Sequence, residues 1–175
     1  MPDDRRSHLT LISGGQSGVD RAALDAALAT GTPYGGWCPK GGWAEDMPEP
    51  PGVLAFYPGL RETPSAKPEQ RTDWNVRDSD GVLLLVGQGG LAVSKGTERA
   101  VARAEAAGKP AILIDLDGPE PVCHVRKVLT SFTGKALCIG GPRESEAPGI
   151  YAEAKFVLEG ALSAWPPGPR RPCRS

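Results

Sequence analysis

The segment His8–Thr30, HLTLISGGQSGVDRAALDAALAT, decides the fold of this chain. Its first six residues form a short, largely apolar run typical of a β-strand, and Gly14–Gly18 has the composition of a turn. Val19–Thr30 is rich in alanine and leucine and places its apolar residues on one helical stripe. Gly31 stands where a helix ends. The segment therefore predicts a strand, a glycine-rich loop and a helix.

The rest of the chain repeats this alternation. Further strands are predicted at residues 82–86, 111–116 and 135–139, and helices at 69–79, 97–107, 119–132 and 149–165. Strands separated by helices need crossover connections, which favour a parallel, doubly wound sheet. We therefore expect an α/β, Rossmann-like, mainly parallel sheet in a single domain. Its expected span is residues 8–165, between a flexible N-terminus at 1–7 and a disordered tail at 166–175.

Residues Thr32–Pro68 interrupt the alternation. This stretch is rich in glycine and proline, and only Val53–Tyr57 has the composition of a short strand. A connection of this length is usually functional or disordered. Trp37 and Trp43 argue against disorder, because buried aromatic side chains can anchor a loop. We expect an ordered but otherwise irregular segment.

The charge balance restricts the classes of partner. The 175 residues contain 20 Lys+Arg and 21 Asp+Glu, a formal net charge of −1. That balance gives no electrostatic reason to bind nucleic acid or an anionic membrane. No apolar run approaches the roughly 20 residues of a membrane-spanning helix, and the charged segment Met1–His8 does not resemble a secretory signal. We expect a cytoplasmic protein without nucleic-acid or membrane partners.

The cysteines do not form a metal-binding pattern. They lie far apart in the sequence, with no CxxC pair, at Cys38, Cys123, Cys138 and Cys173. With only two histidines beside them, they lack the spacing of a zinc site or a redox pair. In a cytoplasmic protein the simplest expectation is reduced thiols. No metal ligand is assigned.

The first glycine-rich loop is a candidate anion site. It joins the first strand to the first helix and consists of Gly14, Gly15, Gln16, Ser17 and Gly18. Glycines let backbone N–H groups approach a ligand, and the helix N-terminus adds about half a positive charge. Ser17 could cap the helix or donate to an oxyanion, so the loop favours phosphate or an oxoanion. The alternative is a tight turn whose glycines only allow the helix to pack closely on the sheet.

A second loop of the same kind follows the strand at 82–86. Its candidate ligand-binding residues are Gly89, Gly90, Lys95, Gly96 and Thr97. Lys95 supplies a fixed positive charge, and Thr97 is a candidate N-cap for the next helix. The alternative is a flexible exposed loop with an incidental lysine. Ligands bind beyond the carboxyl ends of parallel strands, so two such loops, expected on adjacent strands, should meet at one crevice.

Four further candidates for contacts with a phosphorylated ligand are Lys40, Arg77, Arg143 and Tyr151. The lysine would neutralise an oxoanion, either arginine could hold a phosphate through two hydrogen bonds, and the tyrosine would offer its ring or hydroxyl. Solvated surface positions are the alternative for these groups. His8 and His124 lie away from the expected loops, so a Ser-His-Asp triad is not expected and no catalytic residue is assigned.

Taken together, six stretches resemble the molybdenum carrier family. They are SGGQSGVDRAALDAAL (Ser13–Leu28), GGWCPKG (Gly35–Gly41), AEDMP (Ala44–Pro48), ETPSA (Glu62–Ala66), QRTDWNVRDSDG (Gln70–Gly81) and GGPRESEAPGIY (Gly140–Tyr151). Family members are similar to molybdenum cofactor carrier proteins and to lysine-decarboxylase-like phosphoribohydrolases. The resemblance implies a Rossmann-like homo-oligomer that binds the molybdenum cofactor (molybdopterin), molybdate or a nucleotide-like ligand. It also implies that Gly14–Gly18 cradles the phosphate or oxoanion and that Gly89–Thr97 forms the second half of the site.

One departure bears on catalysis. The phosphoribohydrolases carry a PGGxGTxxE motif whose glutamate acts in N-glycosidic cleavage, whereas here Ala100 stands three residues after Thr97. The sequence thus favours a carrier of a phosphorylated small molecule over an enzyme. The alternatives are a nucleotide-binding protein without catalysis and a nucleoside 5′-monophosphate phosphoribohydrolase that uses Glu98 or Asp20 as its acid/base group.

Overall fold

The structure is a computed structural model and describes residues 8–163, so the predicted terminal segments 1–7 and 166–175 lie outside the described residues. The strands are β1 (Thr10–Ile12), β2 (Tyr34–Cys38), β3 (Leu60–Glu62), β4 (Gly81–Val86), β5 (Ala111–Asp115) and β6 (Ala136–Gly140). The helices are α1 (Val19–Thr30), α2 (Pro68–Arg77), α3 (Lys95–Ala106), α4 (Pro121–Ser131) and α5 (Ile150–Leu162). Three short 3₁₀ segments are η2 (Lys40–Gly42), η3 (Gly52–Ala55) and η4 (Gly90–Val93).

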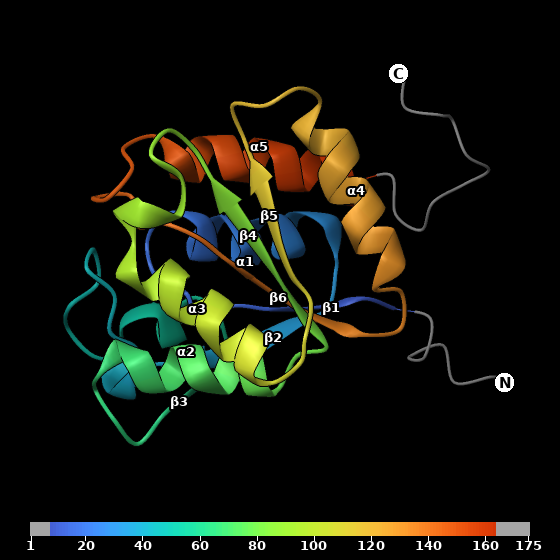
Figure 1. Ribbon diagram of the computed structural model, residues 1–175. Coiled ribbons are helices and arrows are strands. Elements are labelled where there is room, and N and C mark those ends of the chain that lie inside the picture. The colour runs from blue at the N-terminus through green and yellow to red at the C-terminus, as the bar shows by residue number, and fades with distance from the viewer. Residues whose placement is uncertain (1–7, 164–175) are drawn as a thin grey trace, which may run out of the picture.

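The six strands form one sheet in the order β3-β2-β1-β6-β4-β5, and all its neighbouring strands are parallel. Helices α1, α4 and α5 pack together on one face, and α2 packs against α3 on the other (Figure 1). This arrangement confirms the predicted α/β, Rossmann-like fold. The strand that comes last in the sequence, β6, lies in the middle of the sheet, between β1 and β4.

Two clusters of the core lie on the two faces of strand β4. Leu83 and Leu85 of β4 pack with α1, α4 and α5, whereas Val82 and Leu84 pack with residues of α2 and α3. Side chains alternate between the two faces of a strand, so a strand covered on both faces must be apolar at every position. That requirement explains the continuous run Val82–Val86.

The stretch Thr32–Pro68 contains more regular structure than its sequence predicts. Strands β2 and β3 both lie in it, and the predicted strand Val53–Tyr57 is wrong, because η3 occupies most of that segment. The Tyr57 N–H donates to the Val53 carbonyl, and both side chains are buried together, while Phe56 is exposed. A helical turn places residues four apart on the same side. The apolar composition of so short a segment does not distinguish a helical turn from a strand.

Asn75 attaches helix α2 to strand β2. Its amide oxygen accepts from the Trp37 N–H at 2.7 Å, and its amide nitrogen donates to the Trp37 carbonyl at 2.9 Å. Gly36 lies at this contact: its φ is +134°, and a Cβ atom there would lie 2.1 Å from the Ser13 carbonyl oxygen and 3.0 Å from the Asn75 Oδ1 atom. A buried side chain therefore satisfies the backbone of β2 as a neighbouring strand would.

The expectation of reduced thiols is correct for Cys38 and Cys138, which are free and buried, but wrong for Cys123, which is disulfide-bonded. Spacing rules recognise zinc and CxxC patterns and do not detect this disulfide. Across residues 8–163 the helices are all too short or too polar to cross a membrane.

Candidate functional site

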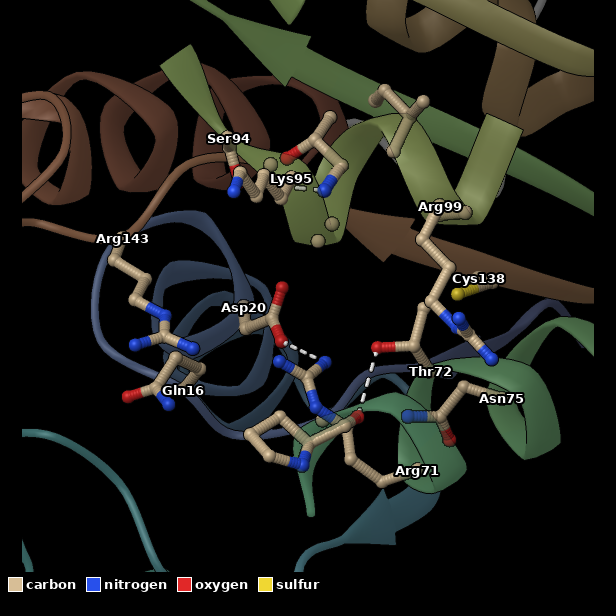
Figure 2. Close-up of a pocket in the computed structure, with 18 of the residues that line it drawn as sticks. Gln16, Asp20, Arg71, Thr72, Asn75, Ser94, Lys95, Arg99, Cys138 and Arg143 are labelled. Carbon is tan, nitrogen blue, oxygen red and sulfur yellow. Dashed lines mark hydrogen bonds and ion pairs between the residues drawn. The ribbon is translucent and has the colours of Figure 1, made fainter. Parts of the chain in front are cut away.

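A cavity of about 560 Å³ opens at the carboxyl ends of the central strands. The loops after β1 and β6 form one wall, the start of α3 forms another, and α2 closes the third side (Figure 2). In a parallel α/β sheet this is the position where ligands bind. The cavity is therefore the candidate site.

The two predicted glycine-rich loops both reach this cavity, although they do not follow adjacent strands. Strand β6 lies between β1 and β4. The expectation of adjacent strands is wrong because the sequence does not reveal where the last strand inserts into the sheet. The loop after β6 consequently joins the other two at the cavity. Of the predicted site residues, those that line it are Gly14, Gln16, Lys95, Gly96, Thr97 and Arg143.

The first turn of α3 presents hydrogen-bond donors to the cavity. Ser94, rather than Thr97, caps this helix: its hydroxyl accepts from the Thr97 N–H at 3.3 Å. The N–H groups of Lys95 and Gly96 are the first two of the helix and have no acceptor within it. Thr97 is only 3% exposed, and among the described residues its hydroxyl has no hydrogen-bond partner. Such a buried, unpaired hydroxyl is uncommon in native proteins and calls for a partner.

The first glycine-rich loop is less available than its composition suggests. The Ser17 N–H donates to the Gln16 side-chain oxygen at 3.0 Å, and the Val19 N–H donates to the Pro142 carbonyl at 3.2 Å. Two of the amides expected to hold an anion are therefore satisfied within the protein. The Ser17 hydroxyl does not cap α1, whose N-cap residue is Gly18; it donates to Glu45 and accepts from the Glu144 N–H at 3.2 Å.

Two glycines of this loop permit close packing. Gly15 has a φ of +72°, and a Cβ atom there would lie 3.0 Å from Leu60. Gly18 has a φ of +77°, and a Cβ atom there would lie 2.3 Å from the Pro142 carbonyl oxygen. Both positions fit the alternative prediction of a tight turn that lets α1 pack against its neighbours.

Asp20 and Arg71 form a buried ion pair on the cavity wall. The Asp20 Oδ2 atom lies 2.7 Å from Arg71 Nη1, with side-chain exposures of 7% and 13%. Burial raises the pKa of the Asp20 carboxyl above its usual value, against the opposing effects of Arg71 and of the backbone N–H of Gln16. Among the described residues the Arg71 Nε atom is buried without a hydrogen-bond partner. The cavity wall thus holds the unpaired Nε–H group of Arg71 and the carboxyl group of Asp20, and both have little contact with water.

Cations surround the rest of the cavity. Beside Arg71 they are Lys95, Arg99 and Arg143, with Glu69 and Glu146 as further carboxylates. Asp73 fixes Arg99 through two hydrogen bonds of 2.7 Å. Arg143 lies over the Trp43 ring, with its guanidinium carbon 5.7 Å from the ring centroid. The lining therefore carries both signs of charge, with the cations on three sides of the space (Figure 2).

The other predicted site residues do not line the cavity. They are Gly15, Ser17, Gly18, Lys40, Arg77, Gly89, Gly90 and Tyr151. Arg77 pairs with Asp78 at 2.6 Å and stacks over Trp74, and the Tyr151 hydroxyl donates to Asp25 at 2.6 Å. Lys40 is exposed in η2, and the two glycines 89 and 90 lie at the start of η4.

Sequence reasoning missed most of the α2 wall. Thr72 and Asn75 line the cavity together with Arg71, and Cys138 of β6 does so from the sheet (Figure 2). Burial raises the pKa of the Cys138 thiol to about 12, so it is not a thiolate at neutral pH. Within residues 8–163 no three His, Cys, Asp or Glu side chains are grouped so as to hold a metal ion. The described lining of the site carries hydrogen-bond donors and charged side chains of both signs.

Comparisons with known proteins agree with this architecture. The crystal structure of the "putative molybdenum carrier protein" from Syntrophus aciditrophicus is similar to this chain, with 38% sequence identity and a TM-score of 0.76. The similarity covers 90% of this chain and 96% of that one. No curated protein matches the chain. Residues 11–162 match the circularly permutated YpsA SLOG family. The chain therefore belongs to the circularly permutated YpsA SLOG family.

Proposed function

We propose that this protein is a carrier that binds a phosphorylated small molecule of the molybdenum-cofactor class, with the phosphate group at the N-terminus of α3. A helix N-terminus attracts anions because its first N–H groups are unpaired and the helix dipole is positive there. Lys95 and Gly96 contribute those N–H groups, and both line the cavity. The similarity to a protein named as a molybdenum carrier supports the choice of cargo.

The hydroxyl of Thr97 carries the proposal. It is buried at the cavity wall and has no acceptor or donor among the described residues. An unpaired buried polar group costs about 1–3 kcal/mol, and a phosphate oxygen in the cavity would remove that cost. The hydroxyl supplies a second reason, independent of the helix dipole, to place an anion here.

Recognition through the phosphate is consistent with the absence of metal-binding clusters in the described part of the chain. The metal of such a cargo would then remain bound to its own pterin ligand, and the protein would hold the organic part. A cavity of about 560 Å³ lies within the range of small-molecule sites.

Hydrolysis of a nucleoside 5′-monophosphate is the second candidate function. Asp20 favours it, because a buried carboxyl with a raised pKa on a cavity wall can act as an acid. Glu98 does not support it, because this residue is exposed and does not line the cavity. Incubation with a panel of monophosphates followed by chromatography separates the two functions: a carrier leaves every nucleotide intact.

The test of the carrier function is a calorimetric titration with inorganic phosphate. Thr97→Val keeps the shape of the side chain and removes the hydroxyl, so phosphate should bind at least about tenfold more weakly. Thr133→Val removes an exposed hydroxyl from the end of α4 and should leave the affinity unchanged. Equal affinity of wild-type protein and Thr97→Val would reject phosphate binding at α3. Separately, mass spectrometry of any small molecule that copurifies with the native protein would identify the cargo.

A further inference from the structure

The Asp20 carboxylate is an acceptor placed inside a site for anions. It lies in the first turn of α1, its side chain is buried, and it lines the same cavity as the start of α3. In Figure 2 it points into the space between Arg71 and the Ser94–Lys95 turn. Arg71 holds the Oδ2 atom, whereas the Oδ1 atom would lie 3.3 Å from a Cβ atom at Gly140. A ligand that enters the cavity meets this carboxylate.

Oxoanions differ in what they can offer to a carboxylate. An ionised carboxylate only accepts hydrogen bonds, so it repels an oxygen that carries no hydrogen. Inorganic phosphate retains a proton at neutral pH, and a phosphate monoester takes one up with a pKa of about 6. Sulfate and molybdate are dianions without a proton near neutral pH. Asp20 can accept a hydrogen bond from inorganic phosphate or from a protonated monoester, but not from sulfate or molybdate.

We infer that Asp20 makes this cavity selective for phosphate groups over sulfate and molybdate, because only a phosphate can donate a hydrogen bond to it. This inference rests on the proposed function and narrows its ligand class to phosphate groups that carry a proton when they bind, namely inorganic phosphate near neutral pH and a monoester in its monoanionic form. It also requires that an anion without a proton binds only when Asp20 itself is protonated. Binding of sulfate should therefore take up one proton.

The surroundings of Asp20 agree with a group that can change its protonation state. The groups that face it or line the same cavity are Gln16 from the loop before α1, Glu69 and Arg71 from α2, Lys95 and Arg99 from α3, Cys138 from β6, and Arg143 and Glu146 from the loop after β6. Burial raises the pKa of Asp20 even though Arg71 opposes the shift. A dianion placed beside this carboxylate would raise the pKa further, so uptake of a proton accompanies binding.

The experiment compares phosphate and sulfate by calorimetry at about pH 7.5, where phosphate carries a proton and sulfate does not. Wild-type protein should bind phosphate at least about tenfold more tightly than sulfate, and Asp20→Asn should reduce that preference to about threefold or less. Glu105→Gln removes an exposed carboxylate of α3 that does not line the cavity and should keep the preference. The sulfate affinity of wild-type protein should rise by up to about tenfold for each pH unit as the pH is lowered towards 5.5.

Each result has a definite meaning. A wild-type protein that binds both anions equally, or a sulfate affinity that does not change with pH, overturns the role of Asp20 while leaving phosphate binding at α3 intact. A wild-type protein that binds neither anion rejects both the site and its selectivity. The pH series uses wild-type protein alone, so the inference stays testable even if Asp20→Asn does not fold.

Discussion

The carboxylate of Asp20 and the guanidinium of Arg71 meet at 2.7 Å directly beside Gly14, which has no side chain to separate them. The three residues come from helix α1, helix α2 and the loop after β1. A charge pair buried at this depth is destabilising unless its geometry is well satisfied. The glycine is thus needed for the position of the ion pair, and the ion pair sets the chemistry of the cavity wall.

Substitution of Gly14 by alanine should displace the ion pair. A Cβ atom at this position would lie 2.2 Å from Arg71 Nη1 and 2.9 Å from Asp20 Oδ2. We expect Gly14→Ala to lower the free energy of unfolding by about 1–3 kcal/mol, measured by urea denaturation. Gly35→Ala is the matched control, because the nearest atom to its new methyl group lies at 3.6 Å. An unchanged unfolding free energy for Gly14→Ala would show that the pair can move without cost.

The contact between Asn75 and strand β2 should be equally sensitive. Asn75→Ala leaves the N–H and carbonyl of Trp37 without the partners that now lie at 2.7 and 2.9 Å. Two unpaired backbone groups should lower the free energy of unfolding by about 2–4 kcal/mol. Gln88→Ala, at an exposed position, should change it little. A loss of less than about 0.5 kcal/mol in Asn75→Ala would mean that water replaces the amide.

The hydroxyls of Tyr57 and Tyr151 both donate to the Asp25 carboxylate, each at 2.6 Å, and this contact predicts a pH dependence. Burial raises the pKa of Tyr151 to about 12, and the hydrogen bond to the Asp25 carboxylate adds to this effect. The unfolded chain has a tyrosine pKa of about 10, so this stabilisation is complete below about pH 10 and is lost as the pH rises towards 12. Ultraviolet absorbance in alkaline titration measures the shift, and Asp25→Asn should lower it. A folded protein in which every tyrosine ionises near pH 10 would contradict the contact.

The sequence identifies those parts of the fold that depend on local composition. The apolar run Val82–Val86 predicts a strand because both of its faces are buried, and β4 confirms it. Strand β2 has no such signal, since its sequence YGGWC contains two glycines. Its backbone is satisfied by Asn75, which is 38 residues away from Trp37 in the sequence. The periodicity of the sequence gives no sign of a contact between residues so far apart.

The same limit applies to the site. The glycines near Thr97 and its position before a predicted helix predict a binding loop, and Thr97 lines the cavity. In the polar helix α2, by contrast, the predicted candidate was Arg77, whereas Arg71 lines the cavity. The two arginines are six residues apart, which rotates the second by roughly 240° around the helix. The composition of the segment predicts helix α2. Only the orientation of that helix in the fold determines which arginine faces the cavity.

The most direct measurement of the central claim is a titration of ¹⁵N-labelled protein with inorganic phosphate, followed by two-dimensional NMR. If the phosphate binds at the start of α3, the amide signals of Lys95 and Gly96 should shift most strongly. The signals of Ser17 and Val19 should move less, because their N–H groups already donate to protein acceptors. Shifts concentrated at Gly15–Val19, or no shifts at saturating phosphate, would contradict an anion site at the N-terminus of α3.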